Sequence, residues 1–328
     1  MRNQEHIKAI QAKIFSSKRV ICYALMFLCV MCFFSCEKSI DYQIENQKSR
    51  VVVYAFPMPD STFQIHVSNT TDILSQKEFE EIDHVAIQYR VNSESLITTN
   101  YPKGEEWYSI GDANLQSKDT VNLQLNVNDS VVVAAQTIIP EPIQILMVDT
   151  LRVLEYNEDD VEEEMLKCDL SIFDPAGVNN FYQIRVDSYT ITEENGIENR
   201  TIETVDILEK DKVFISQDYE ATLLAEIDYQ SSFDDYLING QYYAISFSIP
   251  NRYILNAGIE EKRVLHFYLY SLSPEYYKYI RSVSEQEAFR EDPFYEQSNV
   301  YTNITNGLGV VAGLAMDVDS LTIFDNLK

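Results

Sequence analysis

The feature that most constrains the fold is a two-residue alternation of apolar and polar side chains. The clearest example is TVNLQLNVND (120–129), where every second residue is apolar: Val121, Leu123, Leu125 and Val127. Successive side chains of a β-strand point to opposite faces, so this period is typical of a strand with one buried face. Similar short segments recur through the chain, bounded by turn residues and without long helical patterns. The sequence therefore predicts a mainly β protein.

The alternating segments fall into two blocks separated by a proline-containing connector, IIPEPIQI (138–145). Its two prolines cannot lie in a central strand, and they favour an extended connection between domains. We predict an N-terminal β-sandwich over residues 50–140, immunoglobulin-like in character, and a second β-rich, sandwich-like domain over residues 141–328.

One α-helix is predicted in the second domain, near 274–290. Ser273 suits the N-cap, Pro274 the first helical position, and Glu275 the positive end of the helix. An inward stripe follows at helical spacing, made of Tyr276, Ile280 and Val283. The preceding strand, 264–272, is bulky on both faces, so we expect it to be central and covered on both sides.

The first 35 residues have the pattern of an export signal. A basic front end precedes an apolar run at 20–34, and Ser35 precedes Cys36. The run is short for a membrane-spanning helix and normal for a signal peptide. A cysteine at this place resembles a bacterial lipobox, in which Cys36 receives lipid such as palmitate and becomes the mature N-terminus, followed by a polar tether over 36–49. A plain secreted protein and a signal anchor are the alternatives.

Cysteine count and charge agree with an exported protein. Once Cys22, Cys29 and Cys32 leave with the signal and Cys36 carries lipid, Cys168 has no disulfide partner, so an ordinary core must hold the fold. The net charge is −27, and without residues 1–35 it is about −31, from 20 basic and 51 acidic residues. Such a surface repels phosphate backbones and argues against nucleic-acid binding.

The motifs searched for chemistry predict no catalysis, no cofactor and no metal. The histidines after the signal, His66, His84 and His266, lie far apart in sequence, without zinc-site spacing. Cys168 lies in a strand pattern and is expected to be a buried thiol. The acidic run EYNEDDVEEE (155–164) lacks calcium-loop spacing and is expected at a hairpin tip. GLGVVAG (307–313) lacks the dinucleotide fingerprint, and its glycines are expected to permit close packing against aromatic rings.

Tyrosine is abundant, at 22 residues, and it clusters in the second domain. A ring joined to a hydroxyl favours interfaces and sugar stacking, although β-sandwiches also place Tyr at strand edges. The segment FDDYLINGQYY (233–243) is therefore a candidate partner surface, represented by four residues: Phe233, Asp234, Asp235 and Tyr236.

Five segments together resemble one known family. They are VVVYAFPMPDSTFQIHVSNTTDIL, VVVAAQTIIPEP, IFDPAGVNNFYQIRV (172–186), FDDYLINGQYY and SNVYTNITNGLGVVAG, in this order. Through them the chain resembles the Bacteroidota outer-membrane lipoproteins that carry domain of unknown function 4249. One departure lies in GLGVVAG, where the family typically has Phe before the last Gly.

The resemblance implies an outer-membrane lipoprotein, often associated with TonB-dependent transporters, and brings no catalytic residues. A non-enzymatic accessory or binding protein is the leading interpretation. A structural or adhesive surface protein and a carboxylate-based hydrolase are the alternatives. Partial export signals after Cys36 favour the cell surface over the periplasmic face. Bacteroidota glycosylate Asp-Ser/Thr-apolar triplets, which makes five residues candidates for O-glycosylation: Ser61, Thr120, Ser130, Thr150 and Ser320.

Overall fold

Two buried cores built from four β-sheets account for the architecture, which confirms the mainly β prediction. The described residues all belong to the unit Ser49–Lys328. The computed structural model describes residues 49–71, 82, 84–94, 97–102, 107–111, 114–129, 131–156, 161–194, 197–215, 227–253, 261–290 and 299–323. The predicted signal, the tether, Cys36 and Ser130 lie outside these residues.

Two four-stranded sheets enclose the first core, in the orders β16-β1-β2-β5 and β4-β3-β6-β7. Their inward residues follow the alternation read from the sequence: Val121, Leu123, Leu125 and Val127 are all buried. The strands are β1 (Val51–Ala55), β2 (Gln64–Asn69), β3 (His84–Val91), β4 (Ile97–Pro102), β5 (Trp107–Ser109), β6 (Thr120–Val127), β7 (Val131–Ile138) and β16 (Leu308–Val311).

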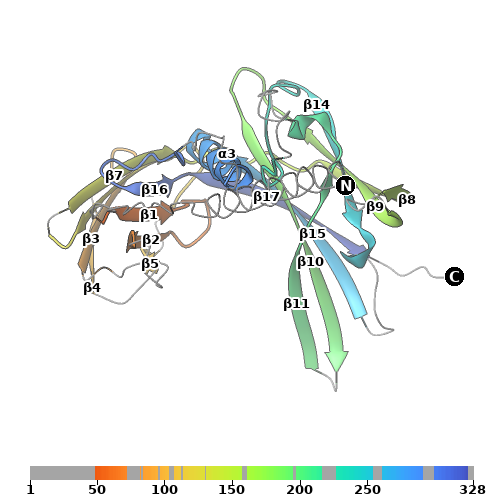
Figure 1. The fold of residues 1–328 in the computed structure, drawn as a ribbon, viewed down its shortest axis with the longest axis horizontal. Helices are drawn as coiled ribbons and strands as arrows, with labels where there is room; N and C mark the ends of the chain where they lie inside the picture. Colours follow the sequence, from red (N-terminus) through yellow and green to blue (C-terminus); the bar gives the residue numbers. More distant parts are fainter. Residues whose placement is uncertain are drawn as a thin grey trace, which may run out of the picture. The chain divides into compact units, whose positions relative to one another are not determined.

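The last of these strands, β16, departs from the predicted boundary. It pairs in parallel with β1, far away in sequence, and Figure 1 shows it in blue beside the orange strands of the N-terminal part. Val311 and Ile304 enter the first core, although the sequence placed them in the second domain. The physical reason is backbone pairing: β1 offers one edge to β2 and the other edge to β16.

Close approach of backbones explains the glycines of GLGVVAG. Gly309 lies opposite Val53 in the β1–β16 register, with φ of +91°. A Cβ atom there would lie 2.1 Å from the carbonyl oxygen of Val53. The predicted close packing is therefore present, but at Gly309 it is against the backbone of β1 rather than an aromatic ring.

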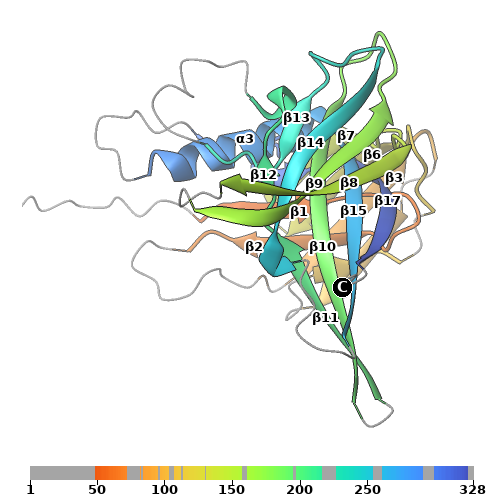
Figure 2. The same ribbon diagram turned by 90° about the vertical axis from the view of Figure 1, so that its right-hand side faces the viewer.

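The second core lies between two further sheets (Figure 2). One has the order β12-β14-β9-β8, and the other has the order β11-β10-β15-β17 with β13 also on β10. The elements are β8 (Met147–Tyr156), β9 (Glu162–Phe173), β10 (Phe181–Glu194), β11 (Ile197–Val205), β12 (Leu208–Glu209), η1 (Lys212–Phe214), β13 (Ser232–Asp234), β14 (Tyr242–Pro250), η2 (Asn251–Tyr253), β15 (Glu261–Leu272) and β17 (Leu314–Ile323). The antiparallel pairing of β8 with β9 up to Tyr156 and Glu162 agrees with the hairpin expected for the acidic run, whose residues 157–160 lie outside the described residues.

Strand β15 is central, as predicted, because it pairs with β10 on one side and β17 on the other. Leu265, Phe267 and Leu269 are fully buried in the second core. The opposite face is different. Val264, His266, Tyr268 and Tyr270 are only half-buried there, so the prediction that both faces are covered is wrong for this face.

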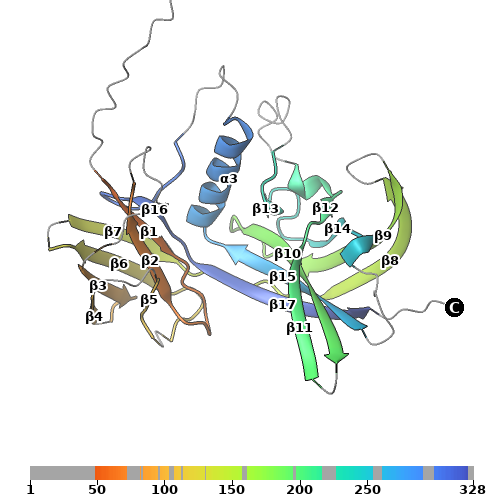
Figure 3. The ribbon, with the colours of Figure 1, turned by 60° about the horizontal axis from the view of Figure 1, so that its bottom comes forward.

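The helix α3 (Pro274–Ala288) confirms the predicted element, with Ser273 at the N-cap and Pro274 at the first position. Ile280 of the predicted stripe is buried, whereas the other two buried residues, Tyr277 and Ser284, each lie one position after the predicted Tyr276 and Val283. The helix packs against Phe181, Leu272 and Leu314 of the neighbouring strands (Figure 3). This contact determines which side of the helix is buried.

Helix α3 also contacts the first sandwich. Tyr276 packs edge-on against Phe56 with ring centroids 5.2 Å apart, and the Tyr279 hydroxyl donates a 3.3 Å hydrogen bond to the Tyr54 hydroxyl. No helix within the described ranges has both the length and the hydropathy of a membrane span.

Substitution of Gly309 tests the backbone contact between β1 and β16. We expect Gly309→Ala to lower the free energy of unfolding by about 3 kcal/mol or more, because a positive φ and a clash with backbone combine. The matched control is Gly177→Ala, since Gly177 has φ of +85° but open space around its Cβ position. Only the conformational cost, about 1–2 kcal/mol, is expected there. Equal losses in urea unfolding would contradict the clash.

Candidate binding surface

The outer face of the sheet formed by β11, β10, β15 and β17 is the strongest candidate site. Antiparallel register places Arg185 opposite Tyr268 and Asp187 opposite His266. Alternate residues of both strands face the second core, so these side chains must point to the other side of the sheet. We call this surface the aromatic face and define it by Arg185, Asp187, Tyr189, His266, Tyr268, Tyr270, Met316 and Val318.

An aromatic ladder follows β15 along this face. Tyr268 is stacked between Tyr270 and His266, with centroid separations of 6.2 Å and 6.3 Å and interplanar angles of 23° and 22°. The spacing arises because residues two apart on a strand project from the same face. Tyr189 on β10 joins the ladder from the side, 4.3 Å from the His266 ring. Four rings thus form one continuous surface.

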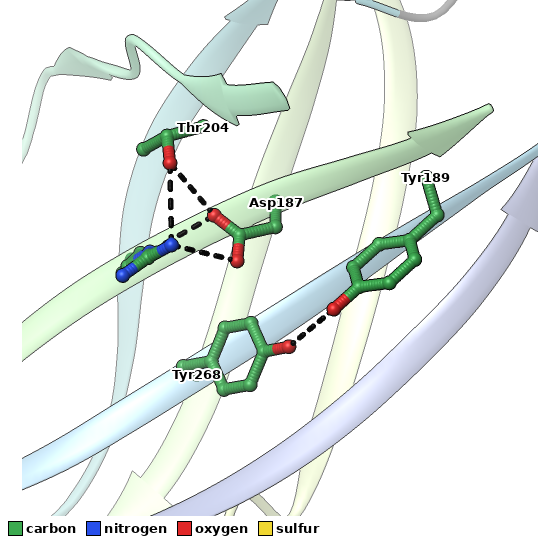
Figure 4. A network of polar contacts seen from close by, with 5 residues as sticks. Asp187, Tyr189, Thr204 and Tyr268 are labelled. Carbon is green, nitrogen blue, oxygen red and sulfur yellow. Dashed lines mark hydrogen bonds and ion pairs between the residues drawn. The ribbon is translucent and has the colours of Figure 1, made fainter. Parts of the chain in front are cut away.

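Hydrogen bonds fix the tyrosines of the ladder. The hydroxyl groups of Tyr189 and Tyr268 are 3.2 Å apart (Figure 4). Burial, followed by this hydrogen bond, raises the pKa of the Tyr268 phenol. The Tyr268 hydroxyl is therefore neutral at physiological pH, and it can donate to or accept from a ligand.

An ion pair lies beside the ladder. Arg185 donates to both oxygens of Asp187, from Nε at 2.9 Å and from its second terminal nitrogen at 3.0 Å, and Thr204 donates to the same carboxylate at 3.1 Å (Figure 4). The Asp187 side chain is 6% exposed and that of Arg185 is 48% exposed. The buried carboxylate therefore holds the guanidinium in a fixed orientation on the surface, and the hydrogen bond to Asp187 raises the pKa of Arg185.

Apolar side chains border the aromatic face. Met316 and Val318 lie opposite Tyr270 and Tyr268 on β17, and Ile202 lies opposite Tyr189 on β11. They are 40%, 46% and 56% exposed, respectively. Exposed apolar residues around fixed rings and a fixed charge are typical of surfaces that bind a partner or ligand.

A groove of about 1260 Å³ continues from the aromatic face. It opens where β10 changes partner, from β11 at Val186 to β13 at Gln183. Its charged lining residues are Glu163, Arg185, Asp206, Glu209, Lys210, Asp228 and Arg252. Because Arg185 and Tyr270 belong to both, the aromatic face and the groove form one continuous site.

A buried polar network lies at one end of the second core. Asp174 is fully buried, and it accepts hydrogen bonds from the Tyr182 hydroxyl at 2.5 Å, the Asn180 side-chain amide at 3.2 Å and the Gly240 backbone N–H at 3.1 Å. Three donors satisfy this carboxylate, which joins the segments 172–186 and 233–243.

Asp235 completes the same network. It accepts from the Asn180 backbone N–H at 3.0 Å and from the Asn239 side chain at 2.9 Å. Burial raises its pKa, and the nearby Asp174 adds to this effect. Asp174 and Asp235 are therefore occupied in holding two loops together.

The two segments joined by Asp174 and Asp235 lie in the part of the chain that matches a known protein family. The sequence model of a family described as domain of unknown function DUF4249 matches residues 37–319. The chain belongs to this family. The match contains both segments joined by Asp174 and Asp235, as well as the aromatic face. The chain matches no curated protein.

The structure corrects the partner surface predicted within the DUF4249 domain. Phe233 and Asp235 are 1% and 4% exposed, so they cannot form a contact surface in this fold. Phe233 packs against the rings of Tyr182 and Phe214, and Asp234 is half-buried. Of the four predicted residues only Tyr236, at 70%, is exposed. The sequence analysis did not identify the aromatic face as a binding surface. A sequence feature could have indicated it, because polar and aromatic side chains alternate with apolar ones along 264–272.

Histidines and the free cysteine lie where the strand pattern predicted. His66 is in β2, His84 begins β3 and His266 is in β15. Cys168 is fully buried in β9, and burial, assisted by Asp169, raises the pKa of its thiol to about 12. The buried-thiol prediction is confirmed. Among the described residues no group of three or more His, Cys, Asp and Glu could hold a metal ion.

Three of the candidate glycosylation residues lie on strands. Thr150 on β8 and Ser320 on β17 are exposed, whereas Thr120 at the start of β6 is half-buried. Ser61, in the loop before β2, is also half-buried. Their modification stays a prediction.

The raised pKa of Asp235 makes a sign-specific prediction for stability. A carboxyl whose folded pKa lies above its usual value of 3.8 stabilises the fold below that value and loses the contribution as pH rises through the raised pKa. The free energy of unfolding of the wild type, relative to Asp235→Asn, should therefore fall as the pH rises above 3.8. Urea unfolding measures it, with the exposed-site variant Asp149→Asn as the control. A difference that stays constant with pH would contradict the assignment.

Proposed function

We propose that this DUF4249 protein is a lipid-anchored accessory protein of the Bacteroidota outer membrane. In this proposal it has no catalytic role and binds a TonB-dependent transporter, its ligand or a neighbouring envelope protein. The observation that carries the binding role is the aromatic face, an open sheet surface with fixed rings, a fixed guanidinium and exposed apolar borders.

The N-terminal sequence supports the anchoring. The apolar run and Ser35 end at Cys36, and the family match begins at the next residue, 37. Cys36 and Ser49 are 13 positions apart in the chain, a distance of at most about 45 Å when the chain is fully extended. A lipid on Cys36 would keep the sandwich unit within that distance of the bilayer.

The chemistry of the aromatic face supports a partner or ligand with mixed character. The ring faces favour apolar surface or the apolar side of a sugar ring, and Arg185 favours an acceptor oxygen. The chain's overall charge of −27 disfavours polyanionic ligands on the rest of the surface. A neutral or cationic partner that presents carbonyl or hydroxyl oxygens to Arg185 fits both conditions.

Two alternatives differ in what they require. A structural or adhesive lipoprotein would need the anchor but no transporter. A carboxylate-based hydrolase would use acids of the groove, such as Glu163, Asp206 and Asp228, as acid and base. Binding of an unaltered ligand supports the accessory role over the hydrolase.

Metabolic labelling tests the anchor. We expect cells that express the full-length protein to incorporate a palmitate analogue, and Cys36→Ser to abolish the label while the signal is no longer cut at this position. Cys168→Ser is the matched control, and it should retain the label because Cys168 is a buried thiol. Label that persists in Cys36→Ser, or is absent from the wild type, would overturn the anchoring.

Co-purification from detergent-solubilised outer membranes tests the binding role. We expect a TonB-dependent transporter to co-purify with the wild type, and Tyr268→Ala to reduce its recovery by about tenfold, because loss of one central ring at an interface costs about 1–2 kcal/mol. The control is Tyr242→Ala, an exposed tyrosine on β14 outside the aromatic face. Thermal unfolding of both variants separates binding from folding. A wild type that always purifies alone contradicts the transporter role.

A further inference from the structure

Among the described residues, β8 is an edge strand that exposes large apolar side chains. It is ten residues long, and within the described parts of the chain it pairs only with β9, at the end of the β12-β14-β9-β8 sheet. Figure 3 shows it on the outer side of β9. Four of its large apolar side chains are 50–70% exposed: Met147, Leu151, Leu154 and Tyr156. A long apolar edge strand offers unpaired backbone groups and readily adds another strand.

The charges of β8 limit which strand can pair with it. Asp149, Arg152 and Glu155 are spaced three apart in the strand MVDTLRVLEY. In an antiparallel pair, residues directly opposite share a face, and like charges there are destabilising. This rule can be applied to an antiparallel pair of two copies of β8, to find which registers avoid like charges in opposite positions.

Two copies of β8 can form one continuous sheet when a two-fold axis runs perpendicular to that sheet. The same faces of both copies then lie on one side, so opposite residues must both be odd or both be even in number. Two registers of this kind keep nine of the ten residues of β8 paired, one centred on Leu151 and one on Arg152.

Only one of these registers avoids like charges. Centring on Arg152 places two arginines face to face and sets Asp149 opposite Glu155. Centring on Leu151 packs Leu151 against its copy and sets Val148 opposite Leu154. In that register Arg152 lies opposite Thr150, and Asp149 opposite Val153. Glu155 lies opposite Met147, so in the register around Leu151 apolar residues meet at the centre and no two charges lie directly opposite each other.

We propose that β8 pairs antiparallel with β8 of a second copy, with Leu151 on the two-fold axis. The pairing is isologous and closes after two chains. It joins two four-stranded sheets into one of eight strands and removes the apolar edges of both. The aromatic face belongs to the other sheet of the sandwich, so the dimer leaves that face accessible. Tyr156, which also lines the groove, is the one residue of β8 left unpaired in this register.

Cysteine cross-linking in the full-length protein tests the register. With Leu151 on the axis, the two Cα atoms at position 151 lie about 4.5–5.5 Å apart, within disulfide range. We expect Leu151→Cys to give a reducible dimer of twice the monomer mass after mild oxidation of cells. The matched control is Asp149→Cys on the same exposed face, whose copies lie about 14 Å apart along the paired strands and should give at least tenfold less dimer.

Sedimentation of the purified full-length protein in detergent provides a second readout. The wild type and Tyr242→Arg should show a concentration-dependent dimer, and Leu151→Arg should remain monomeric. Because both copies are acidic, dimerisation should strengthen as salt rises from about 0.05 M to about 0.5 M. Equal cross-linking of Leu151→Cys and Asp149→Cys, no cross-linking of either, or cross-linking only to a different protein would overturn the proposal. Since no step requires lipid or a transporter, these outcomes are independent of the proposed function.

Discussion

The antiparallel pairing of β10 with β15 is the interaction on which the second half of the structure depends. It spans twelve residue pairs, and its strict alternation sends one row of side chains into the core and the other to the surface. The inner row, with Val186, Leu265 and Phe267, is fully buried. The outer row forms the aromatic face. A one-residue slip would exchange the two rows, so the same hydrogen-bond register that stabilises the core also fixes the site.

Buried polar groups hold the ends of this arrangement. Asp174 and Asp235 accept backbone and side-chain donors from two loops that are far apart in sequence, so hydrogen bonds join the loops in addition to the ring contact of Tyr182 with Phe233. A comparable role falls to Asn303, whose side-chain oxygen accepts from the Val311 backbone N–H while its amide donates to the Val311 carbonyl. These contacts explain why Asp174 and Asn180 in the segment 172–186 are polar residues although Asp174 is fully buried.

The sequence predicted correctly those features whose physical cause acts between residues that are close together in the chain. Strands such as 120–127 and the helix at 274–288 follow from periodicity and capping, which act within a few residues. The burial of Phe233 and Asp235 could not be read this way, because tyrosine-rich loop composition is similar for a surface and for a buried turn. The sequence indicated only part of the aromatic face. The bulky outer row of 264–272 was identified, but whether a second layer covered it depended on where α3 docked.

The sequence by itself determined the strand content, the helix with its N-cap position, the buried state of Cys168 and the acidic net charge. These properties follow from local periodicity and composition. Only the tertiary structure decided that β16 returns to β1, that Gly309 faces the Val53 carbonyl, and that β8 is an edge strand among the described residues. Each of these depends on which backbones approach each other over long sequence separations, and hydrogen-bond partners of that kind leave no periodic trace in the chain.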